Sequence, residues 1–300
     1  LFLIKHGKIE KTIRSNFLKD IKVKKVIFNK QFSYNAFFVK KGRAYTDRIH
    51  NLAIIKDNCL LAGPSYQLDG KKNQNIKKNV VLRIGTPREK KKINGIVLSL
   101  LTGGAGNSNY WHWMFDVLPR FAIAQKAKLK LKIDYFLVPD LKYKFQRESL
   151  ELLNIPIQKL LSSEKFRHIE TKGIVAVDHP YVIKNKPTEE IQNVPKWIST
   201  WLKNNLKPKQ RYNKKKYPKK IYISRKDAVN HSGIRGITNE AEVEEYLQNN
   251  GFKTIILGSF HLTDQIKIFN NAKVIVGLHG AGFANIVFCK KNTKIIEIKP

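Results

Sequence analysis

A stretch near the C-terminal end of the sequence places the strongest constraint on the fold. Residues Lys273–Asn285 read KVIVGLHGAGFAN, a short apolar run followed at once by closely spaced glycines. An apolar run of this length suits a strand covered on both faces. Glycines allow a sharp backbone turn, and the residues Phe283–Phe288 (FANIVF) indicate the start of a helix packed on the sheet. The stretch therefore predicts a strand, a glycine-rich turn and a helix N-terminus.

Such a turn is also a candidate anion-binding site. The unpaired N–H groups of a helix N-terminus, with about half a positive charge, point at a bound ligand. Gly280, Ala281 and Gly282 would present these N–H groups, and His279 lies in the same turn. An ordinary strand-to-helix turn that uses glycine only for its geometry is the alternative, because a lone Gly-x-Gly is a weak signal. The spacing alone leaves both interpretations open.

Composition bounds the class of protein. The chain has 300 residues, enough for two domains of common size, and its hydrophobic content of 42% is typical of a globular protein. The sequence has no apolar run long enough to span a membrane. It begins at Leu1 and ends at Pro300, directly after an apparent strand, so we expect a segment of a longer protein. An anchor outside this segment is left open.

The formal net charge of +34 is typical of proteins that bind nucleic acid. However, lysine greatly outnumbers arginine and is scattered along the chain, whereas arginine is the better bidentate reader of phosphates and bases. We therefore expect no specific nucleic-acid partner. The positive charge instead favours binding to an acidic polymer, or peripheral contact with an anionic membrane surface. Cys59 and Cys289 are far apart in the sequence, so they indicate neither a disulfide framework nor a zinc site. This cysteine usage is typical of a protein in the reducing cytoplasm.

The sequence before Gly95 predicts a β-rich region. Short apolar runs such as KVIF and AFFV alternate with turn signals, which is typical of hairpins, and Val80–Ile84 predicts another strand. From Gly95 onwards, strands alternate with helical segments, and this alternation favours a parallel sheet with helices on both faces. The predicted elements are a strand at Gly95–Leu101, a helix at Asn107–Arg120, a strand at Tyr135–Val138, a helix at Lys142–Leu153 and a strand at Gly173–Val177.

The last third of the chain predicts a second domain. Lys207–Lys220 is rich in lysine and carries two prolines, which favours a solvated linker. After it, strands and helices alternate as in one half of a doubly wound fold. Gly251 is placed to end the helix Glu240–Asn249. We therefore divide the chain into a β-rich region at 1–94, a first Rossmann-like domain at 95–206, a basic linker at 207–219 and a second Rossmann-like domain at 220–300.

His112 and Asp116 are the first candidates for chemistry. They stand four residues apart in a predicted helix and therefore share one of its faces. The pair could act as a general base with its orienting partner, or as two metal ligands, although no third ligand is visible nearby. A buried histidine satisfied by a carboxylate is the plain alternative. Asn107, Ser108 or Asn109 can cap this helix, and Pro119 is expected to stop or kink it.

Arg225 and Arg235 are the second candidates. Arg225 follows the predicted strand Lys220–Ser224, at the strand end where open α/β sheets bind their ligands. Two arginines facing a helix N-terminus would neutralise a diphosphate, as the leaving group of a nucleotide sugar requires. A surface ion pair with Asp227 or Glu240 is the alternative.

Two glycine-rich turns give the first half of the dinucleotide-binding pattern Gly-x-Gly-x-x-Gly, at Gly104–Gly106 and Gly280–Gly282. Asparagine replaces the final glycine in both, at Asn109 and Asn285. No acidic residue follows the first turn at the expected distance and at a strand end. NAD binding is therefore not expected, and the turns instead indicate two similar half-sites.

Taken together, these stretches resemble glycosyltransferase family 61, which includes bacterial capsular-polysaccharide-type enzymes and eukaryotic xylosyl- and N-acetylglucosaminyltransferases. The resemblance covers about Ile96–Ile298. It departs from the family pattern at Gly236, and the C-terminal part of the family domain is expected to be missing after Pro300. It rests on Asn109, His112, Trp113, Asp116, Leu118, Pro119 and Arg120 in the first half, and on Ser224–Arg225, Arg235, Asn239–Glu240, Asp264–Gln265 and Val276–Asn285 in the second.

The resemblance implies an α/β protein of GT-B type, in which two Rossmann-like, doubly wound domains face a cleft that holds the site. It also implies an inverting, metal-independent transfer, without a further cofactor, from a nucleotide sugar, often a UDP-sugar, to a hydroxyl of a glycan acceptor. Family analogy suggests capsular polysaccharide biosynthesis in a bacterium, in the cytoplasm or peripherally at the inner membrane face. The sequence does not set the donor sugar, the acceptor or the linkage.

The resemblance also assigns roles to residues. Asp116 or His112 is the base that deprotonates the acceptor, and the choice between them stays open. Two other classes remain as alternatives: a nucleic-acid or polyanion binding module that uses the positive charge, and a nucleotide-sugar binder without catalytic activity. The residues expected to bind the nucleotide sugar or its acceptor are Arg225, Arg235, Glu240, His279, Gly280, Ala281, Gly282, Asn109 and Gly104.

Overall fold

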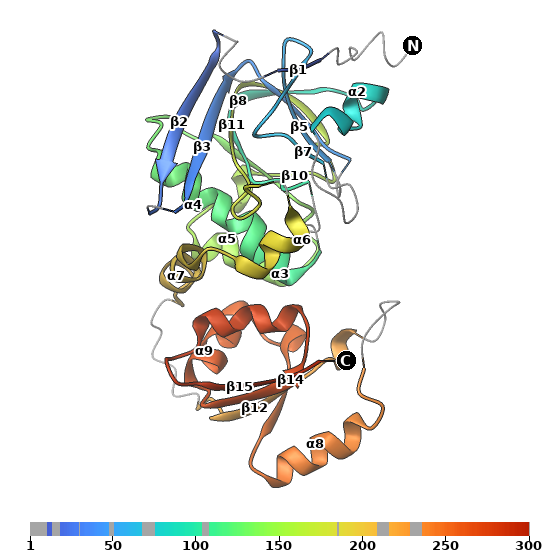
Figure 1. Cartoon of the computed structure of the whole chain (residues 1–300), viewed down its shortest axis with the longest axis vertical. Coiled ribbons are helices and arrows are strands. Elements are labelled where there is room, and N and C mark those ends of the chain that lie inside the picture. The colour runs from blue at the N-terminus through green and yellow to red at the C-terminus, as the bar shows by residue number, and fades with distance from the viewer. Residues whose placement is uncertain are drawn as a thin grey trace. The chain divides into compact units, whose positions relative to one another are not determined.

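The chain divides into two compact units, each with its own β-sheet (Figure 1). The first unit comprises Leu1–Tyr143 and Ile155–Trp201, and the second comprises Lys144–Asn154 and Leu202–Pro300. The computed structural model describes residues 11–13, 19–29, 31–47, 51–67, 76–103, 108–184, 186–208, 216–228 and 236–299. Within these ranges, no helix combines the length and the apolar character that a membrane crossing needs.

The first unit is built on a large mixed sheet. Its strands follow the order β1-β6-β5-β4-β11-β8-β9-β10, with β2 and β3 joined through β11, and β7 joined to β5. The N-terminal strands therefore share one sheet with the parallel strands that follow them in the chain. The strands are β1 (Lys11–Ile13), β2 (Ile21–Ile27), β3 (Ser33–Lys40), β4 (Arg43–Tyr45), β5 (Asn51–Lys56), β6 (Cys59–Leu61), β7 (Tyr66–Gln67), β8 (Lys91–Ser99), β9 (Tyr135–Val138), β10 (Leu160–Ser162) and β11 (His168–Val177).

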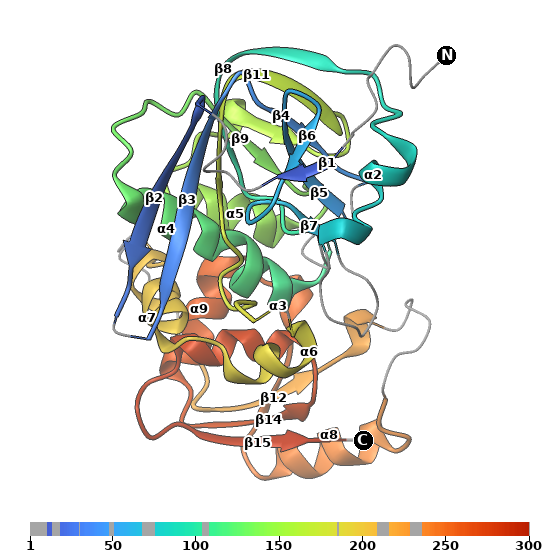
Figure 2. The same ribbon diagram turned by 45° about the horizontal axis from the view of Figure 1, so that its top comes forward.

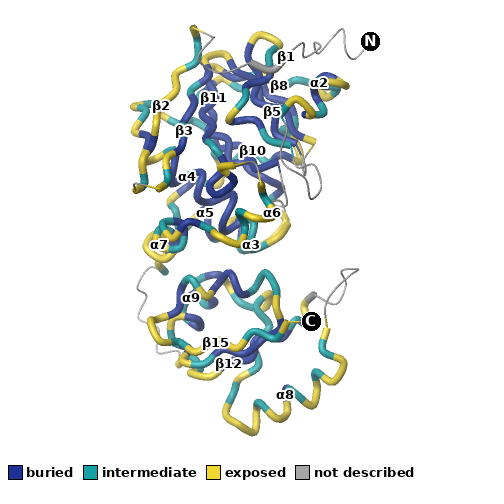
Figure 3. Tube along the Cα trace, in the orientation of Figure 1, coloured by how far each residue is buried: buried dark blue, intermediate teal, exposed yellow. Residues whose placement is uncertain are grey.

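Strand β11 is the centre of this sheet. It pairs in parallel with β8, and antiparallel with both β3 and β4. Strand β11 is buried along most of its length, and β8 is buried mainly in its second half (Figure 3). Val97, Ile169 and Ile174 are fully buried in the main apolar cluster of the unit. This buried centre fixes the position of the residues that follow Val177.

The helical elements of the first unit are short apart from α4 and α7. Helix α4 packs on the long ribbon formed by β2 and β3, which runs along one flank of the unit (Figure 2). Ile123 and Ala127 of α4 meet Val26 and Ala36 of the ribbon. The elements are η2 (Ile76–Lys78), α2 (Val81–Ile84), α3 (Tyr110–His112), η4 (Trp113–Val117), α4 (Leu118–Ala127), η5 (Ile157–Lys159), α6 (Pro187–Glu190), η6 (Ile191–Asn193) and α7 (Lys196–Asn205), and α7 leads into the second unit.

The strand predicted at Val80–Ile84 is wrong, because this segment forms the helix α2. The Asn79 side chain accepts a hydrogen bond from the backbone N–H of Val81 at 3.2 Å, which starts a helical turn. The turn buries Val81 against Tyr45 and Ile55. One helical turn with a single buried residue therefore replaces the expected strand, and short apolar runs do not distinguish the two by pattern alone.

The second unit is an α/β unit with a parallel sheet, as predicted. Its strands follow the order β13-β12-β14-β15, and every described pair within it is parallel. Gly251 has φ +80°, directly after the last turn of α8, as expected for a glycine that ends a helix. The elements are α5 (Lys144–Leu152), β12 (Lys220–Ser224), η7 (Lys226–Ala228), α8 (Glu240–Asn249), β13 (Lys253–Ile256), η8 (Leu257–Ser259), α9 (Leu262–Asn271), β14 (Val274–Leu278), η9 (Ala281–Phe288) and β15 (Lys294–Ile298).

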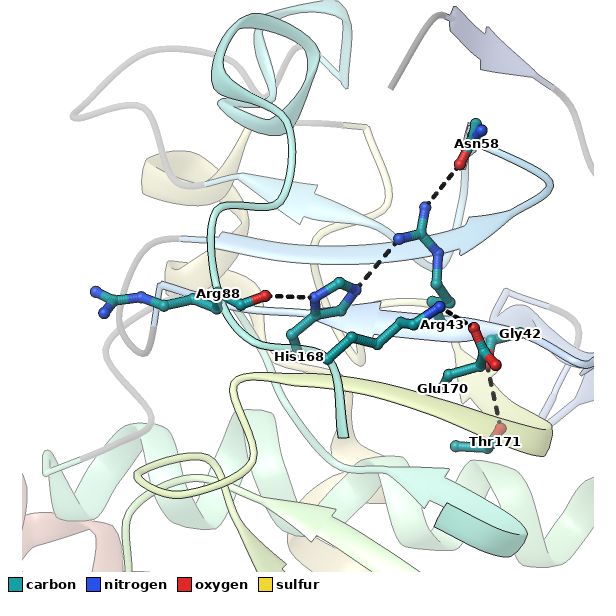
Figure 4. Close-up of polar contacts among 8 residues, drawn as sticks. Gly42, Arg43, Asn58, Arg88, His168, Glu170 and Thr171 are labelled. Atoms are coloured by element: carbon teal, nitrogen blue, oxygen red, sulfur yellow. Dashed lines mark hydrogen bonds and ion pairs between the residues drawn. The ribbon is translucent and has the colours of Figure 1, made fainter. Parts of the chain in front are cut away.

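A buried polar cluster ties β4 to β11 in the first unit (Figure 4). Arg43 donates from Nη1 to Nε2 of His168 at 3.3 Å and from Nη2 to Oδ1 of Asn58 at 3.0 Å. Nδ1 of His168 lies 2.9 Å from the carbonyl oxygen of Arg88. Because a carbonyl oxygen only accepts, Nδ1 carries the proton and Nε2 is the acceptor for Arg43. Burial lowers the pKa of Arg43, and the nearby Glu170 carboxylate acts against this shift.

Replacing Arg43 with leucine is expected to lower the free energy of unfolding by about 1–3 kcal/mol, because it leaves Nε2 of buried His168 without its donor. The denaturant midpoint, followed by circular dichroism, measures this change. The matched control is Lys90→Ala, which removes a half-exposed ion pair with Glu170 in the same cluster. We expect at most about 1 kcal/mol for the control. Equal losses in the two variants would contradict the structural role of Arg43.

Candidate active site

The His112–Asp116 pair lies on a helix whose start is set by Asn109. The Asn109 side-chain oxygen accepts hydrogen bonds from the backbone N–H groups of Trp111 at 2.9 Å and His112 at 3.2 Å. Of the three candidate caps, Asn109 is therefore the one that starts the helix.

Pro119 does not end this helix, contrary to one of the two expectations. The chain passes from α3 through the π-helical turn η4 into α4, with the backbone N–H of Leu118 bonded to the carbonyl oxygen of Trp113. Pro119 then lies in the first turn of α4, where the missing N–H costs little. π-Turns inside helices occur frequently at functional sites. Here the π-turn contains Asp116.

His112 and Asp116 form the direct contact that their spacing predicts. Nδ1 of His112 lies 2.8 Å from Oδ2 of Asp116. The side chain of Asp116 is 4% exposed, whereas that of His112 is 24% exposed. Because a carboxylate oxygen accepts, Nδ1 of His112 is the donor and Nε2 keeps its lone pair. The arrangement is that of an imidazole oriented by a buried carboxylate, with one ring nitrogen left for a proton from outside.

Buried polar groups surround the Asp116 carboxylate. Burial raises the pKa of Tyr181 far above its ordinary value, and the charge of Asp116 raises it further. Burial lowers the pKa of Arg120 to about 10, while the Asp116 carboxylate acts in the opposite direction. Arg120 donates from Nη1 to the carbonyl oxygen of Val177 at 3.1 Å, and its Nε has no hydrogen-bond partner in the described part of the chain. The carboxylate is therefore balanced by a buried guanidinium rather than by solvent.

His179 joins the same environment from the end of β11. Its ring stacks on Tyr66, with centroids 5.1 Å apart, and meets Tyr181 edge-on at 4.6 Å. Its Nδ1 accepts from the backbone N–H of Val182 at 3.1 Å. Burial is the largest cause that holds the pKa of His179 well below its ordinary value, and the charge of Arg120 acts in the same direction. His179 is therefore a neutral structural partner of the site.

The depressed pKa of His179 predicts a pH-dependent stability. In the unfolded chain a histidine has a pKa near 6.5, so below that pH the unfolded state takes up a proton that folded His179 does not. The free energy of unfolding therefore falls as the pH falls below about 6.5, by at most about 1.4 kcal/mol per pH unit for this one group. Urea unfolding between neutral pH and about pH 5 measures this slope. In the His179→Asn variant the slope is expected to be smaller, and an equal slope would contradict the assignment.

In the second unit, Arg225 packs against the glycine-rich turn. It follows β12, and its Nη1 donates to the carbonyl oxygen of His279 at 3.1 Å. A Cβ added to Gly280 would lie 3.3 Å from the Arg225 guanidinium carbon, so the arginine would have to shift by a few tenths of an ångström to accept a side chain there. Nδ1 of His279 lies 2.7 Å from Oε1 of Glu297. Arg225 and the glycine-rich turn, which were both singled out from the sequence, are therefore in direct contact.

The helix expected after the turn is a 3₁₀-helix, η9 (Ala281–Phe288), rather than an α-helix. The backbone N–H of Phe283 bonds to the carbonyl oxygen of Gly280 at 3.0 Å. The first N–H groups of a helix lack intrahelical partners, and in η9 these belong to Ala281 and its neighbour Gly282. Buried Asn285 donates to Gln265 at 3.0 Å and holds η9 on α9.

Glu240 does not pair with Arg225 among the described contacts. Its Oε1 accepts hydrogen bonds from the hydroxyls of Tyr222 and Ser224, both at 3.0 Å. Burial raises the pKa of Tyr222, and Glu240 raises it further. Asp227, the other suggested partner of Arg225, accepts instead from the backbone N–H of Gly258 at 2.9 Å. The guanidinium of Arg225 is therefore oriented by a carbonyl oxygen and not neutralised by these carboxylates.

Two predicted site residues, Gly104 and Arg235, lie outside the described residues. Conversely, sequence reasoning missed Tyr66, His179 and Tyr181. The sequence Asp178-His179 at the carboxyl end of a buried strand was a usable signal for His179, because ligands bind at such strand ends. Across the described ranges, no group of three or more His, Cys, Asp or Glu side chains is arranged to hold a metal ion.

Comparison with known proteins identifies the family to which the chain belongs. Residues 110–296, which include both the His112–Asp116 pair and the Arg225 turn, match the sequence model of the family described as Glycosyltransferase 61. This match places the chain among the glycosyltransferases. The chain belongs to glycosyltransferase family 61, as its motifs predicted.

One similar protein is a plant enzyme. The chain is 37% identical over 90 residues to the xylan glycosyltransferase MUCI21 of Arabidopsis thaliana. The aligned stretch is 29% of this chain and 17% of the plant protein, so it spans only a small part of that relative.

Proposed function

We propose that this protein is an inverting, metal-independent glycosyltransferase that moves a sugar from a nucleotide sugar, most simply a UDP-sugar, to a hydroxyl of a glycan. The observation that carries the proposal is the contact between Nδ1 of His112 and Oδ2 of Asp116 at 2.8 Å, in a chain of glycosyltransferase family 61. Such a pair provides the general base that an acceptor hydroxyl needs.

Of the two residues, we propose His112 as the base and Asp116 as its orienting partner. Asp116 is almost completely buried and uses one oxygen to hold the imidazole, whereas His112 is partly exposed. The acceptor hydroxyl transfers its proton to Nε2 of His112 as its oxygen attacks the anomeric carbon. The bond between that carbon and the diphosphate oxygen breaks on the opposite face, so the configuration inverts. The Asp116 carboxylate stabilises the imidazolium that forms.

The leaving diphosphate is assigned to Arg225 and to the backbone N–H groups at Gly280–Gly282. An arginine and a helix N-terminus together can stabilise the negative charge that develops without a metal ion. The packing of Arg225 against Gly280 supports this role, because it brings both kinds of donor to one turn. Glu240, which orients β12 through Tyr222 and Ser224, is proposed to support the strand end that carries Arg225.

A transfer assay tests the proposal directly. Purified protein is incubated with UDP-, GDP- and CMP-sugars as donors, in the presence of a chelator. The acceptors are neutral oligosaccharides, and they include xylan fragments because the plant relative is named for xylan. We expect release of one nucleotide diphosphate, selective for one donor, and NMR of the product should show the inverted anomeric configuration. Retention of configuration, or a strict metal requirement, would contradict the mechanism.

The wider assignments are proposals of the same kind. A GT-B organisation is supported by the parallel sheet of the second unit, and work at an anionic membrane surface in bacterial polysaccharide synthesis is supported by the charge of +34. The same charge favours the rival class, a polyanion-binding module. Affinity for DNA or heparin that falls steeply with salt, without selective nucleotide binding, would favour the rival. Selective binding of UDP without any transfer would indicate a nucleotide-sugar binder that lacks activity.

A further inference from the structure

A cavity of ≈ 400 Å³ lies wholly within the first unit, and His112 and Asp116 do not line it. Its volume falls in the range of about 300–1,000 Å³ that is usual for small-molecule sites. It is bordered by Ser33 and Tyr34 of β3, Tyr66 and Gln67 of β7, and Asp178 and His179 after β11. The residues from β3 and β7 precede residue 110, where the family match begins.

The described wall of the cavity is poorly suited to the phosphates of the nucleotide-sugar donor. Among the described residues that line it there is no lysine and no arginine, although the chain carries 57 of them. The charged side chain of the wall is Asp178, a carboxylate. A nucleotide diphosphate needs cationic or N–H donors around its phosphates. The wall therefore suits a neutral ligand rich in hydroxyl groups.

The wall also offers the two kinds of contact that a sugar ring makes. Tyr66, which is partly exposed, provides aromatic surface for the C–H faces of the ring, and the exposed Ile183 adds aliphatic surface. Asp178 provides a carboxylate that accepts from hydroxyls. Its Oδ2 is already held by the backbone and side-chain N–H groups of Asn35, at 2.7 and 2.9 Å, which leaves Oδ1 for a ligand.

The aromatic part of the wall is held in place before any ligand arrives. The Tyr34 hydroxyl donates to the carbonyl oxygen of Pro180 at 2.8 Å and accepts from Nε1 of Trp197 at 2.9 Å. Tyr66 is stacked on His179. A rigid wall lowers the entropy cost of binding, as expected for a specific site rather than for a packing defect.

A row of ring contacts links this wall to the His112 helix. Trp111 meets Tyr181 edge-on at 5.9 Å, Tyr181 meets His179 at 4.6 Å, and His179 stacks on Tyr66 at 5.1 Å. The charge of Asp116 contributes to the raised pKa of Tyr66, after the larger effect of burial. The cavity wall and the proposed base are therefore parts of one packed and electrostatically coupled assembly.

From these observations we infer that the cavity binds a neutral sugar unit of the glycan acceptor, so that residues of the N-terminal β-rich part select the acceptor. This inference rests on the proposed function, because it assigns the acceptor of that reaction to a site. It assigns the cavity to the acceptor and leaves the nucleotide to the Arg225 turn.

The variant Ser33→Trp tests the inference. Ser33 is an exposed residue at the start of β3, so an indole there can fill the rim of the cavity without disturbing the core. Binding of neutral xylose, glucose and N-acetylglucosamine oligosaccharides is measured by titration calorimetry in the presence of UDP. We expect Ser33→Trp to weaken oligosaccharide binding by at least about tenfold, with UDP affinity and slow donor hydrolysis unchanged. The control Val23→Trp places the same side chain at an exposed position of β2 that does not line the cavity, and it should bind as the wild type does.

The two proposals fail in different ways. If the wild-type protein binds none of the oligosaccharides, or if Ser33→Trp binds them as tightly as the wild type, the acceptor assignment is overturned even when donor hydrolysis is normal. If instead the protein binds a neutral oligosaccharide at this cavity but neither binds nor hydrolyses any nucleotide sugar, the cavity assignment as a neutral-sugar site stands and the transferase mechanism is overturned.

Discussion

Replacing His112 with glutamine is expected to lower kcat for glycosyl transfer by about 10²–10⁴-fold, because the variant lacks the ring nitrogen that accepts the acceptor proton. His112 is partly exposed and its backbone N–H is held by the Asn109 cap, so the fold should persist. UDP affinity should be unchanged, because the diphosphate is assigned to the second unit. Steady-state kinetics together with UDP titration measure the two effects separately.

The histidine–carboxylate pair of His261 and Glu148 provides the matched control. His261 contacts Glu148 through the same ring nitrogen, but its side chain is 70% exposed. His261→Gln should leave kcat unchanged.

Replacing Asp116 with asparagine should abolish most transfer, as His112→Gln does, because an amide does not fix the proton on Nδ1 of His112 as a carboxylate does. The thermal unfolding of this variant must be measured in parallel, since the substitution leaves the buried Arg120 charge without its partner. Normal transfer by His112→Gln would contradict the assignment of the base.

Local sequence patterns predicted the parallel sheet of the second unit and the contact between His112 and Asp116. The apolar run Val274–Val276 became β14, and the alternation of strand and helix after residue 220 became a parallel sheet. The spacing of His112 and Asp116 gave a contact that the structure confirms, because residues four apart on a helix must be neighbours. In each case the information lies within a few residues of the element.

Contacts between distant segments could not be predicted in this way. Tyr66 and His179 stack although β7 and the end of β11 are far apart in the chain, and Arg43 meets His168 across a separation of 125 residues. Only the pairing of β4 and β3 with β11 brings such residues together. The helix at Val81–Ile84 begins with hydrogen bonds that Asn79 accepts from the backbone N–H groups of Val81 and Leu82, and the apolar pattern does not encode these bonds.

Replacing Arg225 with alanine is expected to weaken UDP binding by about 10–100-fold, because it removes a charge-assisted donor worth about 1.5–3 kcal/mol. The rate of transfer should fall by about 10²–10³-fold, since the same group stabilises the departing diphosphate. Arg225 donates only to the exposed turn at His279 in the described contacts, so its loss should change the unfolding transition little. Calorimetric titration with UDP and a transfer assay measure the two effects.

Variants of two residues next to Arg225 distinguish its specific role from general effects of charge and shape. Lys226→Ala removes the next cation along the chain, which is paired with Glu244, and should leave UDP affinity unchanged. Gly280→Ala places a Cβ 3.3 Å from the Arg225 guanidinium carbon at a position with extended backbone, so the arginine must shift by a few tenths of an ångström. This variant should weaken UDP binding in the same direction but less than Arg225→Ala, because the donor is displaced rather than removed. If Lys226→Ala weakens UDP binding as much as Arg225→Ala does, the site acts through overall positive charge, and the assignment of the diphosphate to Arg225 is wrong.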